Sequence, residues 1–143
     1  MAERTENDEG GEAKMYLVVH NVQSKANIGM LTRCAVALGC AEVVVAGAKK
    51  IREEGSHGSA AHISICWQPS LQDTMSHLRQ RRNVTCFLGL EITRSARYVH
   101  HHPFPPRQNV ALLVGNEGAS FSLRRSHPLR LAFKPTLFSL LFR

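Results

Sequence analysis

The sequence lacks several features that would assign it to common classes of protein. It contains no apolar run of about 18 residues, which excludes a transmembrane helix because crossing the bilayer takes about 20. It also lacks the Gly-x-Gly-x-x-Gly and Gly-x-x-x-x-Gly-Lys-Ser/Thr motifs, which argues against the usual dinucleotide and mononucleotide phosphate loops. The chain is long enough for one globular domain.

Paired cysteines are also missing. Cys34, Cys40, Cys66 and Cys86 form no Cys-x-x-Cys motif, and each lies in or beside apolar sequence. Disulfide frameworks and structural zinc sites use more closely spaced cysteines. We therefore interpret all four as reduced core thiols of an intracellular protein. The cytoplasm is the simplest compartment for such a protein, and the sequence does not decide between it, the nucleus and the organelles.

Acidic residues are absent from one end of the chain. Residues 119–143 hold none, so the net charge of +7 comes mainly from this end. Residues 1–14 are acidic and lack the apolar core of a signal peptide, and we expect a disordered leader there. Basic patches can contact nucleic-acid phosphates, although solvated loops and helix ends explain such charges as well.

The sequence does contain short apolar runs that alternate with helical patterns. Strands are expected at 16–20, 42–46, 84–90 and 110–114, with a short one at 129–133. A first helix is expected with Asn27 as N-cap, Ile28, Leu31, Ala35 and Leu38 on one face, and Gly39 after its end. A second opens at Pro69 and Ser70, with Asp73 in a capping box and Leu71, Met75 and Leu78 buried. This alternation predicts an α/β fold, a parallel sheet with helices on both faces.

Two polar segments follow expected strands. Gly115-Asn116-Glu117-Gly118 comes directly after the last main strand, where open α/β sheets bind ligands and where glycine lets the backbone approach them closely. A tight turn with a polar cap is the alternative. The second segment follows the strand at 16–20 and contains Asn21, Asn27 and Gly29. Arg33 lies four residues after Gly29, and its side chain leans toward the helix N-terminus, although a solvated surface arginine has the same spacing.

Together these segments resemble the SpoU (TrmH) family of RNA ribose methyltransferases, in the SPOUT superfamily. The matching residues are Asn21, Asn27, Ile28, Gly29, Arg33, Gly39, Gly115, Asn116, Glu117 and Gly118. The resemblance divides the chain into the leader (1–14), a partial SpoU-type methyltransferase domain (15–122) and an atypical basic and apolar tail (123–143). It implies a SPOUT-type α/β knot.

The resemblance also implies an activity, namely S-adenosylmethionine-dependent methylation of a ribose 2′-oxygen in tRNA or rRNA by a homodimer. Arg33 would act as an electrostatic clamp on the developing oxyanion, because a guanidinium holds its proton too tightly to be a good base. Asn27 would orient Arg33 or the ribose, and Glu117 would fix the substrate. The expected wall of the cofactor pocket is Gly115, Asn116 and Gly118.

The sequence departs from the family pattern after Gly118. Ser120 stands where a glycine is usual, and the Ser-Leu-Asn motif that completes the knot, the cofactor pocket and part of the dimer interface is absent. The completeness of the knot therefore stays open. The alternative function is a catalytically inactive, truncated member that acts as an RNA-binding or regulatory partner. A flavodoxin-like nucleotide-binding module ranks last, since it would not explain Asn27 and Arg33.

Three consecutive histidines, His100 to His102, raise the question of a metal site. Neighbouring residues of an extended chain point in opposite directions, and no cysteine or carboxylate flanks the run at ligand spacing. We expect a polar loop and assign no metal. The RNA and the nucleotide that would be modified stay open.

Overall fold

The computed structural model describes residues 12–47, 61–90, 97–98, 104–115 and 131–134. Its elements are β1 (Met15–His20), α1 (Lys25–Ala37), β2 (Glu42–Ala46), β3 (Ser64–Gln68), α2 (Leu71–Arg82), β4 (Val84–Leu90), β5 (Arg97–Tyr98), β6 (Asn109–Gly115) and β7 (Leu131–Lys134). Within the described ranges, no helix has the length and apolar character needed to cross a membrane.

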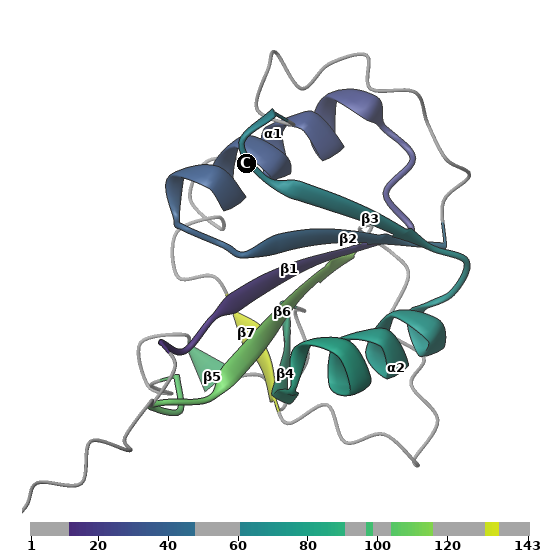
Figure 1. Ribbon diagram of the computed structural model, residues 1–143. Coiled ribbons are helices and arrows are strands. Elements are labelled where there is room, and N and C mark those ends of the chain that lie inside the picture. Colours follow the sequence, from purple (N-terminus) through teal and green to yellow (C-terminus); the bar gives the residue numbers. More distant parts are fainter. Residues whose placement is uncertain (1–11, 48–60, 91–96, 99–103, 116–130, 135–143) are drawn as a thin grey trace, which may run out of the picture.

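The strands form one sheet in the order β3-β2-β1-β6-β4-β7-β5 (Figure 1). Every neighbouring pair in this order is parallel. The predicted α/β fold with a parallel sheet is therefore confirmed. The four main strands expected from the sequence are present, and the short strand expected at 129–133 is found as β7.

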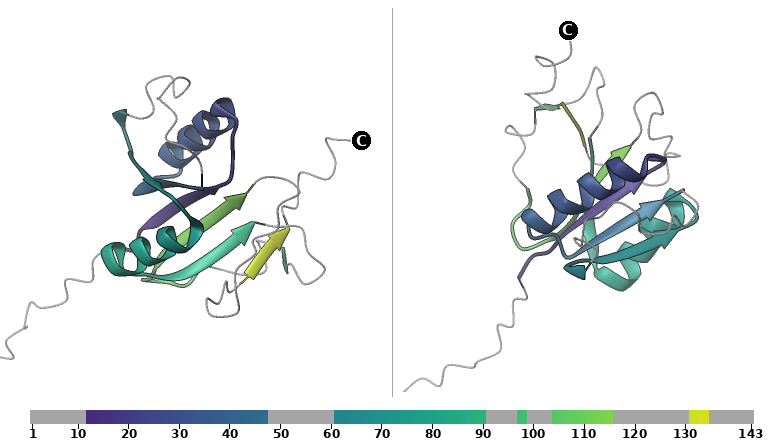
Figure 2. Two further views of the ribbon diagram at one scale, coloured as in Figure 1. Left: turned by 90° about the vertical axis from the view of Figure 1, so that its right-hand side faces the viewer. Right: turned by 90° about the horizontal axis from the view of Figure 1, so that it is seen from above.

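The two helices cover opposite faces of the sheet, as Figures 1 and 2 show. Successive strand side chains point to opposite faces, so each central strand contributes to two apolar layers. One layer packs beneath α2 and contains Val18, Val44, Met75, Leu78 and Leu113. The other packs beneath α1 and contains Leu17, Val19, Ile28, Ala35 and Val45. Burial on both faces explains why these strands are continuous apolar runs.

Helix α1 begins earlier than expected. Its N-cap is Ser24, whose Oγ accepts a hydrogen bond from the Asn27 backbone N–H at 3.4 Å. The prediction of Asn27 as N-cap is therefore wrong, because serine is an equally good cap and lies one turn closer to β1. This shift places Asn27 inside the first helical turn, with an exposed side chain.

The other end of α1 agrees only in part with the prediction. Gly39 has a φ of +69°, which is the left-handed conformation expected of a glycine that follows a helix. Leu38, expected on the buried face, is the C-cap residue and is 73% exposed. The helix has already ended at Ala37, so the helical spacing no longer applies to Leu38. Thr32 instead joins Ile28 and Ala35 on the buried face.

Helix α2 follows its prediction closely. The Ser70 Oγ accepts a hydrogen bond from the Asp73 N–H at 3.0 Å and donates one to the Asp73 carboxylate at 2.5 Å. The bond from the Asp73 N–H is the N-cap half of the expected capping box, while the Asp73 carboxylate contacts the Ser70 hydroxyl. Leu71, Met75 and Leu78 are buried as predicted. The C-cap residue Asn83 has a φ of 51°, which asparagine tolerates better than most residues.

The cysteines differ more from one another than expected. Cys86 is buried, Cys40 and Cys66 are partly buried, and Cys34 is exposed on α1, so its interpretation as a core thiol is wrong. Burial raises the pKa of the Cys40 thiol, which therefore stays protonated near neutral pH. Residues 1–11 of the leader, most of the tail and the three histidines lie outside the described residues.

Candidate functional site

The site begins where two central strands end side by side. β1 and β6 are adjacent and parallel, and the last residue of each, His20 and Gly115, are register partners. β1 leads through α1 to β2 on one side of this pair. β6 leads to β7, which lies on the other side beyond β4. Such a divergence between adjacent strands marks the place where open α/β sheets bind ligands.

The backbone at this edge is shaped by residues with positive φ. Asn21, directly after β1, has a φ of 55°, and its N–H donates to the Ala46 carbonyl at 3.0 Å. Gly47, directly after β2, has a φ of 75°, and a β-carbon there would lie 3.8 Å from the His20 ring. The ends of β1 and β2 are thus linked by the backbone hydrogen bond of Asn21, one of the residues on which the family resemblance rests.

His20 is a polar residue of this edge that the sequence analysis did not single out. Burial lowers the pKa of its imidazole, so the side chain is neutral near pH 7. A neutral imidazole offers one donor and one acceptor nitrogen instead of a positive charge. The signal in the sequence was a single titratable residue at the carboxyl end of an otherwise apolar strand.

Two of the predicted catalytic residues lie on α1. Asn27 is in the first turn and Arg33 in the third, and both side chains are exposed. A separation of six residues places them about 9 Å apart along the axis and about 120° apart around it. The described part of the chain shows no hydrogen bond between them. It also holds no ion-pair partner for Arg33, so nothing described neutralises this guanidinium.

Of the predicted cofactor-binding residues, the structure places Gly115 at the end of β6. Asn116, Glu117 and Gly118 follow it and lie outside the described residues. The structure therefore brings Gly115 beside the end of β1, from which the chain runs into α1 with Asn27 and Arg33. The positions of the other three residues remain predictions.

The outer face of α1 is apolar. Met30 is 58% exposed, and it is accompanied by the exposed helix residues Ala26, Cys34 and Ala37, with the exposed C-cap residue Leu38 directly after them. Arg33 lies beside this face on the same helix. A solvent-exposed helix ordinarily presents charged and polar side chains outward, so this face is unusual for a surface helix.

A cavity of about 460 Å³ lies at the opposite edge of the sheet. Its lining includes residues at or just before the starts of strands, among them Lys14, Tyr16, Glu42, Ser64 and Asn109. The cavity is therefore separate from the candidate ligand site, which lies at the carboxyl ends of the strands. Glu42 is buried there and forms an ion pair with Arg82, with 2.8 Å between Arg82 Nε and a Glu42 carboxylate oxygen.

Three solved structures illustrate the similarity of this fold to known proteins. The AdoMet-bound rRNA methyltransferase from Sinorhizobium meliloti has a TM-score of 0.73 at 18% identity, over 88% of this chain and 48% of that one. The SpoU methyltransferase AviRb from Streptomyces viridochromogenes has a TM-score of 0.69 at 22% identity, over 90% and 52%. The A. aeolicus TrmH/SpoU tRNA modifying enzyme has a TM-score of 0.60 at 14% identity, over 87% and 62%.

At these identities the likeness shows the fold, and the chain spans about half the length of the first two proteins. A comparison with curated proteins finds no match. The family comparison is more decisive, because the sequence profile of the SpoU rRNA Methylase family matches residues 14–126. This range includes both motifs and every strand from β1 to β6. The chain therefore belongs to the SpoU rRNA methylase family.

Proposed function

We propose that this chain is an S-adenosylmethionine-dependent 2′-O-ribose methyltransferase that acts on tRNA or rRNA as a homodimer. One observation carries the proposal: the ends of β1 and β6 lie side by side at the point where their connections diverge. The first family motif follows one of these ends, and the second begins at the other.

The cofactor would lie at the end of β6. When bound, S-adenosylmethionine supplies an electrophilic methyl group. Gly115 fits such a neighbour, because it ends a strand at the ligand-binding edge and has no β-carbon to keep a ligand away from the backbone. We assign the wall of the pocket to Gly115, Asn116 and Gly118.

Arg33 would act on the RNA. Its exposed guanidinium has no ion-pair partner in the described part of the chain, so it is available to an anion. We assign it the stabilisation of the negative charge that develops on the ribose 2′-oxygen, together with contact to the adjacent phosphate. The distance along α1 favours a contact between Asn27 and the ribose over one between Asn27 and Arg33. Glu117 would hold the substrate by hydrogen bonds.

The apolar outer face of α1 supports the homodimer. Met30 and Leu38 are the two most exposed large apolar side chains of the described residues. A second copy of the chain that packs on this face would remove them from water, which is favourable at about 25 cal/mol for each Å². It would also bring Arg33 to the boundary between the subunits.

Replacing Met30 with glutamate is expected to weaken self-association at least tenfold, because an interface would then bury an unpaired carboxylate at a cost above about 1.4 kcal/mol. Sedimentation equilibrium over a concentration series measures the change. Gln72→Glu is the matched control, since it adds the same charge to an exposed position of α2. A dimer that tolerates both Met30→Glu and Leu38→Glu would place the interface elsewhere.

A second candidate function is that of an inactive family member that binds RNA or regulates a partner. It is favoured by the sequence after Gly118, where Ser120 replaces a glycine and no Ser-Leu-Asn motif follows. Such a protein would keep the fold without a working cofactor pocket.

Calorimetric titration of the folded chain with S-adenosylmethionine tests the proposal. We expect micromolar binding, and transfer of labelled methyl groups to ribose 2′-oxygens when tRNA or rRNA is added. A chain that is folded by circular dichroism but binds no cofactor would contradict the first candidate. Retention of RNA by that same chain would then support the second.

A further inference from the structure

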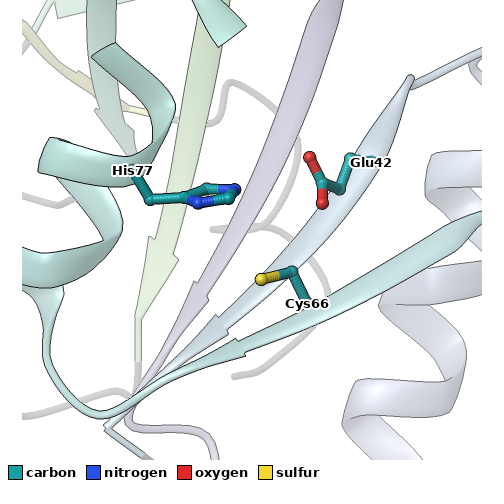
Figure 3. Close-up of side chains that lie close together, drawn as sticks. All are labelled: Glu42, Cys66 and His77. Carbon is teal, nitrogen blue, oxygen red and sulfur yellow. The ribbon is translucent and has the colours of Figure 1, made fainter. Parts of the chain in front are cut away.

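We propose that Glu42, Cys66 and His77 form a zinc-binding site between α2 and the sheet, independent of methyl transfer. The three side chains come from β2, β3 and α2 respectively, and they converge as Figure 3 shows. Their potential ligand atoms, a carboxylate oxygen, a thiol sulfur and an imidazole nitrogen, all lie within 4.8 Å of one another. These are the three kinds of protein ligand that zinc uses.

One polar atom of this cluster is buried without a partner in the described part of the chain. His77 Nε2 is buried and has no hydrogen-bond partner among the described residues, and an unpaired buried polar atom is unfavourable. With its proton on Nδ1, the imidazole presents the Nε2 lone pair to Glu42 and Cys66 (Figure 3). A zinc ion in the centre would accept that lone pair.

The separation of the ligand atoms suits a small tetrahedral ion after a modest adjustment. Zinc bonds of about 2.0–2.3 Å place neighbouring ligand atoms about 3.3–3.8 Å apart. The ligand atoms lie within 4.8 Å of one another, so any excess over this spacing is small enough for side-chain rotations of glutamate and histidine to remove. The backbones of β2 and β3 are already fixed by their parallel pairing, in which Val44 is the partner of Cys66.

Outer contacts hold two of the ligands in place. Arg82 donates to both carboxylate oxygens of Glu42, at 2.8 and 3.4 Å, and Gln68 Nε2 donates to Cys66 Sγ at 3.4 Å. Such contacts orient metal ligands and tune their affinity. Glu42 is 3% exposed, and its hydrogen bond with Arg82 raises the pKa of that guanidinium. Because Arg82 shares the Glu42 carboxylate, the carboxylate and a Cys66 thiolate would offset only part of the charge of the ion.

The fourth position would be taken by water. Three protein ligands with one open position distinguish this site from a closed structural site built from four cysteines. Of the three ligands, Glu42 also lines the cavity at the edge of the sheet where the strands begin. Bound zinc would connect α2 to β2 and β3 and stabilise this side of the fold.

This proposal revises the expectation that the chain has no metal site. The ligands are separated by 24 and 11 positions in the sequence, so no short motif shows them. They meet because β2 and β3 are adjacent and because α2 returns across the same face.

Zinc and cobalt titrations of the full chain test the site. We expect one high-affinity zinc ion in competition with a chromophoric chelator, and a thiolate-to-metal charge-transfer band when cobalt replaces zinc. Cys66→Ser and His77→Gln are each expected to weaken zinc affinity at least about 100-fold, since even outer-shell changes weaken metal binding about 10- to 100-fold. Zinc should also raise the unfolding midpoint of the wild type and not that of the two variants.

Matched controls separate this site from other metal ligands of the chain. Cys34→Ser and His62→Gln change exposed residues and should leave the affinity unchanged. Replacing His100, His101 and His102 together with glutamine should also leave it unchanged. The proposal is overturned if that triple variant loses the ion while Cys66→Ser retains it, or if the folded wild type binds no zinc. The cobalt spectrum of the wild type decides the matter even where a variant fails to fold.

Discussion

Arg33→Ala is expected to lower the rate of methyl transfer by about 100- to 1,000-fold while leaving the affinity for S-adenosylmethionine nearly unchanged. The reason is that the proposed role of Arg33 is confined to the transition state, and loss of one oxyanion-stabilising donor typically has an effect of this size. Single-turnover transfer of a labelled methyl group measures the rate, and calorimetry measures the affinity. The exposed position of Arg33 means that the fold should tolerate the change.

Two further variants sharpen this test. Arg33→Lys keeps the charge but loses the planar two-pronged donor, so it should restore only part of the rate. Arg81→Ala removes an exposed arginine near the opposite edge of the sheet and should leave the rate unchanged. An equal loss of rate and of cofactor affinity in Arg33→Ala would assign the residue a structural role and refute the clamp.

Leu113→Ala is expected to lower the free energy of unfolding by about 3–5 kcal/mol. Leu113 lies in β6 and is completely buried beneath α2, where few neighbours can move to fill the space left by the shorter side chain. Because small domains are stable by only about 5–15 kcal/mol, this loss is a large part of the total. Denaturant unfolding followed by circular dichroism measures it.

Leu113→Met is the matched control, because it nearly preserves the volume and should lower the stability by less than about 1.5 kcal/mol. Both variants lie two residues before Gly115, so they also report on the support beneath the candidate site. Similar stabilities for the two variants would show that β6 is not the packed centre of the sheet.

Much of the fold could be predicted because the central strands are recognisable in the sequence as apolar runs. β1, β2 and β6 are apolar on both faces and therefore appear as continuous runs. β3 was missed because Ser64–Gln68 is a partly exposed edge strand of mixed composition. The start of α1 was misplaced because Ser24 and Asn27 are both good caps, and only the hydrogen bond to Ser24 distinguishes them.

The candidate site could be predicted less completely. The motif identified Arg33 and Gly115, but the pairing of His20 with Gly115 depends on the order of strands, which local patterns do not encode. For the same reason no pattern pointed to Glu42, Cys66 and His77, whose proximity arises from tertiary packing.

The place of β6 between β1 and β4 also governs how the molecule can be made. β1 pairs with β6 across a gap of 95 positions in the chain, from Met15 to Val110. A ribosome therefore releases β1 and β4 before β6, the strand that lies between them, and until then one edge of β1 has no neighbour. Contacts between such distant segments slow folding, and the partly folded intermediates that precede them are prone to aggregate. The pair of strands that brings the two motifs together is thus among the last parts of the sheet that a growing chain can complete.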